Sequence, residues 1–369
     1  MIRDSVRTYA RERLAPFAAQ WDRAATFPRE ALAGLAKMGL YAIAVPEQWG
    51  GAGLNYLAVA IAMEEIAAGD ASTSTIIAVN NLVAGILNGY GSPEQKERYL
   101  RPLASGAALG CFCLTEPQVG SDASAILTRA RREGDHWVLN GIKQFITSGK
   151  TADIAVVFAV SERGAGKDGI SAFIVPTATP GYTVAHIEEK MGQHASDTAQ
   201  IVIENCAVPS ENLLGREGEG YRIALSNLEG GRIAIAAQAV GIARAAYEAA
   251  LKYARERVTF GKPLIEHQAA NFHLADMATG IEVARQMVWH AAALRDAKRA
   301  CLVEASMAKL FASDTAEKVC SEAIQLHGGY GYVSDFPVER LYRDARVTRI
   351  YEGANDIQRM LIGRAIAGE

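Results

Sequence analysis

The sequence predicts a mostly helical α+β protein built from three successive domains. Three observations predict this fold class: apolar residues recur at helical spacing over the first 105 residues, short β-rich runs follow, and long alanine-rich helical patterns return from about residue 218. We therefore expect an N-terminal helical domain (residues 1–107), a middle antiparallel β-barrel or sandwich (108–214) and a C-terminal four-helix bundle (215–369).

The N-terminal part carries both periodicity and capping signals. Apolar residues recur at helical spacing over residues 2–14, and further helical patterns cover 29–37, 56–68 and 72–87. The run Ser92-Pro93-Glu94-Gln95 supplies an N-cap, a first-turn proline and a capping-box partner in order. These signals specify helices and carry no information about chemistry.

The middle part changes to the short, β-branched runs of strands. Turn signals such as Gly134-Asp135 and Pro180-Gly181 separate these runs. No helical pattern intervenes between them, so a parallel dinucleotide-binding sheet is not expected. The expected strands are residues 112–115, 137–139, 154–158, 172–175 and 201–203.

The C-terminal part returns to long helices that are apolar on more than one side. A bundle of such helices is typical of a domain that also buries surface against other subunits. The expected helices are residues 221–255, 265–297, 302–327 and 357–367.

Composition places the chain among ordinary globular proteins. Half of its 369 residues are hydrophobic, 21% are charged, and the net charge is −3 with no long run of either sign. Binding to nucleic acid or to an anionic membrane is therefore not expected. No apolar run approaches the roughly 20 residues of a bilayer span, and the first residues do not resemble a secretory signal. We expect a cytoplasmic protein.

Cysteine usage predicts neither disulfides nor a metal centre. The five cysteines are scattered and include no Cys-x-x-Cys pair. Cys320 and His327 lack a cluster of further ligands around them, so no metal is expected. The cysteines are Cys111, Cys113, Cys206, Cys301 and Cys320.

The segment 349–359 is the strongest candidate for a catalytic element. It places Glu352 between an aromatic residue and Gly353, before a helix that Asn355 or Asp356 can cap. The glycine permits close approach of the backbone to a ligand, and a peptide N–H beside the carboxylate can serve as an oxyanion donor. Proton removal next to a carbonyl needs this combination. By residue type alone, a solvated glutamate in a helix connection is the commoner interpretation.

Four other motifs have both a functional and a structural interpretation. The loop 115–122 exposes N–H groups and hydroxyls that suit a planar heterocycle and a phosphate, and it also fits an ordinary strand exit. The run 145–148 has an aromatic face that equally suits a core. In 257–262, Arg257 and Thr259 suit a pyrophosphate, or the arginine simply complements a helix C-terminus. The glycines of 325–332 permit close backbone approach but lack the spacing of a dinucleotide fingerprint.

Taken together and in this order, these segments resemble the acyl-CoA dehydrogenase family over nearly the whole chain. The specific parts are Thr-Glu-Pro…Gly-Ser-Asp, Gln-Leu-His-Gly-Gly and Tyr-Glu-Gly-Ala-Asn-Asp-Ile-Gln-Arg, supported by Arg-Val-Thr-Phe-Gly-Lys. The resemblance implies the three domains above, bound FAD, and a homotetramer (a dimer of dimers) in which a neighbouring subunit completes the flavin cleft.

The resemblance also implies roles for individual residues. Glu352 matches the catalytic base, and Gly231, at the base position of some relatives, cannot act as one. The implied cofactor contacts are Phe112, Leu114, Thr115, Ser121, Phe145 and Thr147 in one subunit, and Arg257, Thr259, Phe260, Gln268, Gln325 and Gly329 across an interface, with Asn355 and Asp356 near the flavin. The implied substrate contacts are Ser121, Glu229, Arg232, Tyr351 and Gly353.

Three positions depart from the family pattern. Relatives often have tryptophan at Phe145, threonine at Ala354, and aspartate or asparagine at Glu229. A phenylalanine is still a suitable flavin neighbour. Ala354 lacks a hydroxyl, so any hydrogen bond from that hydroxyl to the flavin is absent or replaced by Asn355.

The implied reaction is the α,β-dehydrogenation of an acyl-CoA thioester to a trans-2-enoyl-CoA. The Glu352 N–H, with a flavin ribityl hydroxyl as the family implies, would stabilise the enolate oxygen while Glu352 removes the proton. An electron-transferring flavoprotein would reoxidise the flavin. Gly231 and Phe145 favour a short or branched short acyl chain, such as butyryl or isobutyryl. One alternative is a flavin oxidase or monooxygenase of the same fold, and the monooxygenase would not require the base. The other is a non-catalytic acyl-CoA-binding protein, which would need neither an intact base nor intact flavin loops.

Overall fold

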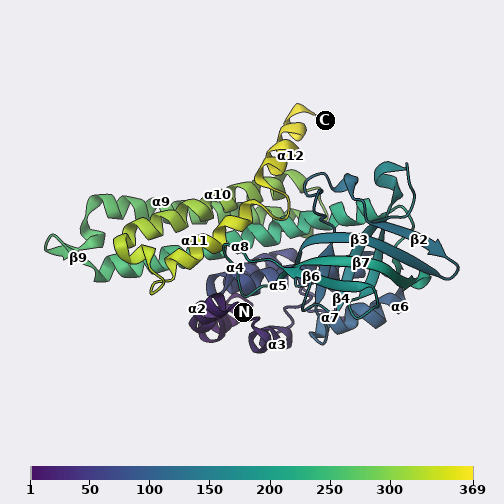
Figure 1. Ribbon diagram of the computed structural model, residues 1–369. Helices are drawn as coiled ribbons and strands as arrows, with labels where there is room; N and C mark the ends of the chain where they lie inside the picture. The colour runs from purple at the N-terminus through teal and green to yellow at the C-terminus, as the bar shows by residue number, and fades with distance from the viewer. Residues whose placement is uncertain (1, 369) are drawn as a thin grey trace.

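The computed structural model describes residues 2–368 and arranges them as helices, then a sheet, then longer helices (Figure 1). The sheet lies at one end of the molecule, and the long C-terminal helices extend from it toward the other end. The helices of the first part are α1 (Ile2–Tyr9), α2 (Ala15–Ala24), α3 (Arg29–Lys37), α4 (Tyr56–Gly69), α5 (Ala71–Tyr90), α6 (Pro93–Gln95) and α7 (Arg101–Ser105).

Side-chain caps fix where several of these helices begin. Asn55 accepts a hydrogen bond from the Ala58 N–H at the start of α4, and Asp70 does the same for the Thr73 N–H at the start of α5. The predicted capping box at Ser92 is confirmed, with both reciprocal hydrogen bonds to Gln95 present. Such caps satisfy backbone donors that a helix leaves unpaired at its N-terminus.

The middle part forms one eight-stranded sheet. Its order is β6-β7-β3-β2-β4-β5-β8, with β1 added beside β4. Most pairs are antiparallel, as predicted, whereas β1 and the start of β2 run parallel to β4. The strands are β1 (Gly110–Cys113), β2 (Arg129–Glu133), β3 (His136–Thr147), β4 (Ile154–Val160), β5 (Ile170–Pro176), β6 (Tyr182–Ile187), β7 (Thr198–Pro209) and β8 (Leu213–Leu214).

Strand β4 has a continuous rather than an alternating hydrophobic pattern. Its residues from Ile154 to Ala159 are all buried. Val156 and Phe158 contact a core shared with α5 and α7, whereas Ala155 and Val157 face a second core between strands. A strand covered on both faces has no solvent side on which to place polar residues.

The C-terminal part packs around one long helix. Helices α8, α9, α10 and α11 share a hydrophobic core with α4 of the N-terminal part. Helix α11 was not predicted, and α12 rises away from the rest of the molecule (Figure 1). The elements are α8 (Gly220–Glu256), β9 (Val258–Thr259), β10 (Lys262–Pro263), α9 (Gln268–Asp296), α10 (Leu302–His327), α11 (Val338–Arg346) and α12 (Asn355–Ala367).

Within residues 2–368, no helix has the length and hydropathy needed to cross a bilayer. Over the same residues, no group of three or more His, Cys, Asp and Glu side chains is arranged to hold a metal ion.

Candidate active site

The turn between α11 and α12 holds Glu352 in an unusual backbone conformation. Glu352 has φ of 53° and Gly353 has φ of 86°, so two consecutive residues lie in the left-handed region. A non-glycine residue there costs about 1–3 kcal/mol and persists only when its surroundings enforce it. A Cβ at position 353 would lie 2.5 Å from the Gln358 Nε2 atom, so a side chain there would displace the Gln358 amide in addition to straining the backbone.

Helix α8 runs directly against the Glu352 carboxylate. A Cβ built on Gly231 would lie 2.5 Å from Glu352 Oε2, which means that the helix backbone itself touches the carboxylate. The two base positions compared in the sequence, Gly231 and Glu352, therefore lie side by side in space. The absence of a side chain at Gly231 gives Glu352 its room.

The surroundings of Glu352 set the pKa of its carboxyl at about 7. Burial raises its pKa to about 7, while the nearby cations Arg232 and Lys309 act in the opposite direction. Within residues 2–368, Glu352 Oε2 is buried without a hydrogen-bond partner, and so are Nε and Nη1 of Arg232. Burial also lowers the pKa of the Arg232 guanidinium. A carboxylate with a free lone pair and a pKa near 7 is suited to general-base catalysis.

Tyr351 anchors the turn from the other side. Its hydroxyl donates a hydrogen bond to Gln238 Oε1, accepts one from Gln193 Nε2 at 3.2 Å, and lies 3.4 Å from Thr75 Oγ1. Burial raises its pKa to about 12, so it remains neutral. The sequence interpretation gave Tyr351 a substrate contact, but protein groups already engage its hydroxyl.

Asn355 has a different role from the one predicted. The N-cap of α12 is Ala354, with no side-chain capping hydrogen bond, so the prediction that Asn355 or Asp356 caps this helix was wrong. Instead, Asn355 Nδ2 donates to Ser313 Oγ at 3.0 Å and to Asp314 Oδ1 at 2.8 Å. With its amide turned into α10, Asn355 is not a replacement for the hydroxyl absent at Ala354.

A cavity of about 340 Å³ opens beside Gly231 between α4, α5 and α8. Arg295 lines it and is held by Glu229 at 2.7 Å and by the Tyr56 ring, whose centroid lies 4.3 Å from the guanidinium carbon. Glu229 also accepts a hydrogen bond from Cys301 Sγ at 3.1 Å. The predicted substrate contact Glu229 is thus already paired with Arg295. The apolar lining includes Val59, Ala78, Leu82 and Ala234.

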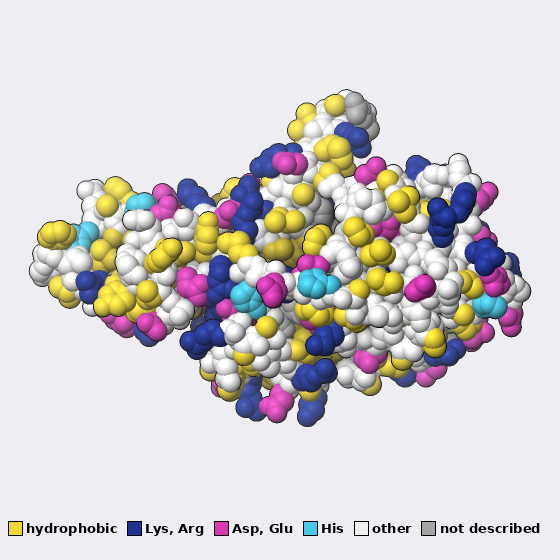
Figure 2. Space-filling model, in the orientation of Figure 1, with side chains coloured by type: hydrophobic (Ala, Val, Ile, Leu, Met, Phe, Trp, Pro, Cys, Tyr) yellow, Lys and Arg dark blue, Asp and Glu magenta, His cyan; other side chains and the backbone are white. Residues whose placement is uncertain are grey.

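The flavin contacts predicted in the middle domain come together where β1 meets β3. Lys143 Nζ donates to the Leu114 carbonyl at 3.1 Å, and the Gln144 N–H donates to the Thr115 carbonyl at 2.8 Å. A bulge in β3 turns Phe145 outward with φ of 57° and leaves its side chain 62% exposed. Figure 2 shows hydrophobic side chains gathered beside the hollow between α12 and the sheet. An exposed aromatic ring next to strand-end hydroxyls fits a planar heterocycle.

The remaining members of that set are distributed along the same strands and loop. Phe112 also packs on Phe158, with ring centroids 5.0 Å apart, so it serves the core as well. Thr147 is the last residue of β3 and is partly buried, whereas Ser121 is exposed on the loop after β1.

Sequence reasoning missed the ion pair that shapes this loop. Glu116 and Lys143 are both buried and lie 2.8 Å apart. Glu116 also accepts hydrogen bonds from the Leu127 N–H at 2.6 Å and the Thr128 N–H at 2.9 Å, which ties both ends of the loop together. The available signal was the glutamate inside the Thr-Glu-Pro motif.

The second predicted cofactor set lies at the far end of α8. Four of its members, Arg257, Thr259, Gln325 and Gly329, line one cavity of about 580 Å³. Phe260 is 98% exposed at the β9–β10 turn, and Gln268 is exposed at the start of α9, so neither belongs to that lining.

The two cofactor sets lie in different parts of the chain. Gly231 and the end of α8 at Glu256 are separated by roughly 38 Å, given a rise of about 1.5 Å per residue. Figure 1 likewise places β9 and the strands β2 and β3 at opposite ends of the molecule.

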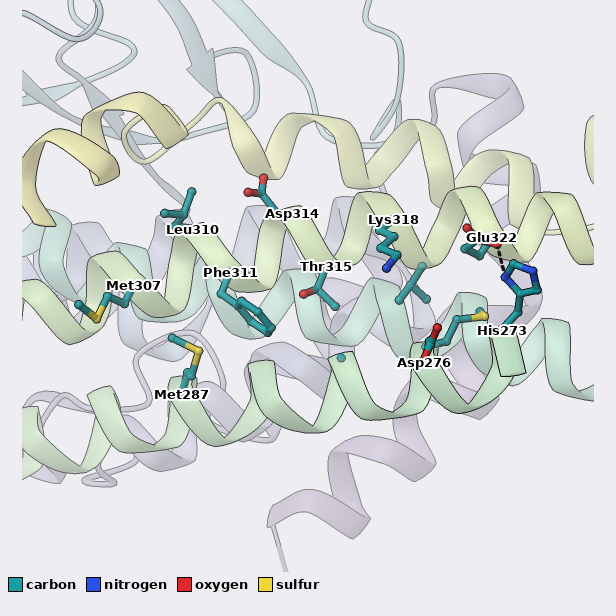
Figure 3. Close-up of a pocket in the computed structure, with 13 residues that line it drawn as sticks. His273, Asp276, Met287, Met307, Leu310, Phe311, Asp314, Thr315, Lys318 and Glu322 are labelled. Carbon is teal, nitrogen blue, oxygen red and sulfur yellow. Dashed lines mark ion pairs between the residues drawn. The ribbon is translucent and has the colours of Figure 1, made fainter. Parts of the chain in front are cut away.

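A larger cavity of about 750 Å³ lies between α9 and α10 (Figure 3). Its lining does not include Glu352 or any residue of the cavity beside Gly231. An ion pair of 2.8 Å between His273 and Glu322 closes one end. The side chains at the other end are Met287, Met307, Leu310 and Phe311.

Comparison with known families matches the chain in three consecutive pieces. Residues 1–107 match the model for the acyl-CoA dehydrogenase N-terminal domain, 111–206 that for the middle domain, and 218–367 that for the C-terminal domain.

Individual relatives are similar over almost the whole chain. The short-chain specific acyl-CoA dehydrogenase of Rattus norvegicus mitochondria is 49% identical over 98% of this chain and 88% of its own length. The butyryl-CoA dehydrogenase of Megasphaera elsdenii superposes with a TM-score of 0.97 at 41% identity, covering 99% of this chain and 98% of that one. A chain from the structure of the electron transferring flavoprotein of Acidaminococcus fermentans has a TM-score of 0.98 at 45% identity, covering 100% of this chain and 97% of that one.

Proposed function

Because the chain belongs to the acyl-CoA dehydrogenase family of FAD-dependent oxidoreductases, we propose that it oxidises a short-chain or branched short-chain acyl-CoA to the trans-2-enoyl-CoA, with Glu352 as the base. The observation that carries the proposal is the Glu352 carboxylate itself. It lies against Gly231 with one oxygen free of hydrogen bonds within residues 2–368, and burial raises its pKa to about 7.

Proton removal is the step for which this chain supplies the groups. The α-proton of a thioester is weakly acidic, so charge developing on the carbonyl oxygen needs a donor while the proton leaves. The Glu352 N–H is that donor in our proposal, and one such donor contributes roughly 3–4 kcal/mol. The acyl chain would enter the 340 Å³ cavity and exclude water from Glu352. FAD, when bound, accepts the hydride from the β-carbon.

The substrate proposal is supported by the cavity and by the relatives. Tyr56 and Leu82 are among the residues that line the cavity of about 340 Å³. The relatives quoted above include a short-chain specific enzyme and a butyryl-CoA dehydrogenase. Both favour about four acyl carbons over longer chains, and a branched isobutyryl group remains within the proposal. Arg232 and Gly353 would lie closest to the thioester, beside Glu352.

We propose that the flavin site is shared between two copies of the chain in a homotetramer. The placement of the two cofactor sets at opposite ends of the molecule (Figure 1) supports this, because one copy can supply Phe145 and its neighbours while another supplies Arg257 and Gln325. The cavity of about 750 Å³ between α9 and α10 offers a surface for a further copy of the chain, since its apolar side chains Met307 and Phe311 are partly exposed (Figure 3). Sedimentation velocity tests this, and a species of one chain at micromolar concentration would contradict it.

An electron-transferring flavoprotein is the proposed electron acceptor. The chain from the structure of the Acidaminococcus fermentans electron transferring flavoprotein is 45% identical to this one. The alternative is an oxidase of the same fold, which would pass electrons to oxygen. Mixing the substrate-reduced protein with air-saturated buffer separates the two, because an oxidase is reoxidised within its turnover time and a dehydrogenase is not.

The deciding experiment is an anaerobic titration of the purified protein with butyryl-, isobutyryl- and octanoyl-CoA, followed by visible absorbance. Bleaching of the flavin bands by one ligand identifies the substrate class, and Glu352→Gln should stay yellow while losing nearly all turnover. A yellow protein that none of the three bleaches would refute the substrate proposal. If Glu352→Gln kept most of its activity, Glu229 would be the next candidate base.

A further inference from the structure

Lys309 is a fully buried lysine for which the proposed reaction has no use. It lies in the N-terminal third of α10, and its side chain has no exposed surface. Burying an ammonium group is costly unless polar partners compensate. Its partners are therefore informative, and they belong to the catalytic turn: Nζ donates to the Gly353 carbonyl at 2.8 Å and to Asn355 Oδ1 at 2.9 Å.

The same turn is held from a second direction by an uncharged donor. Gln358 Nε2 donates to the Gly353 carbonyl at 2.8 Å. One carbonyl oxygen thus accepts from both Lys309 and Gln358. These two donors enforce the left-handed backbone at Glu352 and Gly353, which would otherwise relax.

Resting on the function proposed above, we propose that Lys309 is a positioning residue, which fixes the turn that presents Glu352 and places an ammonium group beneath that turn. The placement supports both parts. Its ammonium touches the residue that follows Glu352 and the first residue of α12, and it is among the cations whose charge acts on Glu352.

The other charges around this pair come from three elements. Arg232 of α8 acts on Glu352 in the same direction as Lys309, and Glu229 of α8 acts on Arg232. Asp314 of α10 favours the charged form of Lys309, whereas Arg349 and Arg232 disfavour it. Burial is the largest influence and lowers the pKa of Lys309 to about 7. Removing Lys309 therefore leaves Arg232 as the remaining cation of the two that act on Glu352.

The chain offers a matched pair of variants. Lys309→Met removes the hydrogen bonds to the Gly353 carbonyl and to Asn355 Oδ1 together with the charge. Gln358→Met removes hydrogen bonds to the Gly353 and Glu352 carbonyls without removing a charge. Both should loosen the turn and lower turnover. Only Lys309→Met should make Glu352 harder to ionise.

The measurement is an infrared titration of the Glu352 carboxyl in the holoprotein, isolated as the difference between each variant and the same variant carrying Glu352→Gln. We expect Lys309→Met to move the titration midpoint upward by about one pH unit, and Gln358→Met to leave it in place. Lys309→Arg should stay near the wild-type midpoint. With butyryl-CoA, the acidic limb of kcat/KM should move with the infrared midpoint.

An unchanged midpoint in Lys309→Met overturns the inference, as does an equal shift in Gln358→Met, which would assign the effect to a loosened turn. If Lys309→Met does not fold, Lys309→Gln takes its place, since an amide can still donate to the carbonyl without the charge, and the same shift is expected. The infrared readout needs no turnover. A protein that shifts as expected yet is bleached by no acyl-CoA would therefore refute the proposed substrate while retaining the role of Lys309.

Discussion

Gly231→Ala should remove most of the proposed dehydrogenase activity while leaving the fold intact. Gly231 lies inside α8, where alanine favours the helix over glycine by about 0.5–1 kcal/mol. The free energy of unfolding should therefore stay the same or rise slightly. The active site, in contrast, has no room for the added methyl group.

The size of the effect follows from the contact distances. A Cβ on Gly231 would lie 2.5 Å from Oε2 and 3.0 Å from the carboxyl carbon of Glu352, whereas ordinary contact begins at 3.4 Å. Since the carboxylate ends a flexible side chain, it moves rather than the helix. A displacement of about 1 Å costs about 10²-fold in rate. That corresponds to ~2.7 kcal/mol of barrier height.

Stopped-flow absorbance of the flavin after anaerobic mixing with butyryl-CoA measures the affected step, and thermal unfolding measures stability. Gly363→Ala in α12 is the control, because its Cβ meets nothing within 4 Å. A Gly231→Ala protein that reduces its flavin at the wild-type rate would refute the reasoning. Either Glu352 would not be the base, or its carboxylate would not lie against α8 during the reaction.

Three further predictions concern charge. The pKa of Glu352 lies at about 7, above its ordinary value, and the ionised form is the proposed base. The value of kcat/KM should therefore fall about tenfold per pH unit below pH 6 and level off above pH 8. A flat pH profile would contradict this. Glu116→Gln strands a buried Lys143 and should lower the free energy of unfolding by about 3–5 kcal/mol in urea titrations, with partial recovery when Lys143→Met is added. Arg257→Gln should weaken FAD retention about tenfold or more in dialysis, without moving the Glu352 titration.

The sequence was most informative where the signal is local and long. The helix predicted at 302–327 matches α10, and the continuous apolar run at 154–158 lies within β4. Helix α11 was missed because its nine residues are rich in charge, and their burial against α8 and α10 comes from tertiary packing. A short charged segment carries little helical signal of its own.

In the candidate site, too, the sequence motif predicted the residue, whereas its contacts depend on tertiary packing. The family motif identified Glu352, but it could not show that Lys309 and Asn355 meet beneath it. Lys309 lies on a long helix whose other lysine, Lys318, is exposed to solvent, and only the packed turn makes Lys309 a buried donor. Asn355 was interpreted as a helix cap because asparagine before a helix usually caps it. In the folded chain the amide instead bonds to α10, and α12 begins without a side-chain cap.

The balance of charges beneath the turn explains why a base can be buried here. Burial alone would leave Glu352 protonated at neutral pH, and two cations without burial would make it a weak base with a low pKa. Because burial is the larger influence, the pKa settles at about 7 rather than below its ordinary value. Arg232 and Lys309 therefore do not neutralise Glu352 as a structural ion pair would; they offset burial enough for the carboxylate to be ionised at neutral pH and still accept a proton. Oε2 has no hydrogen-bond partner within residues 2–368, which in the proposed function leaves its lone pair free for the α-proton.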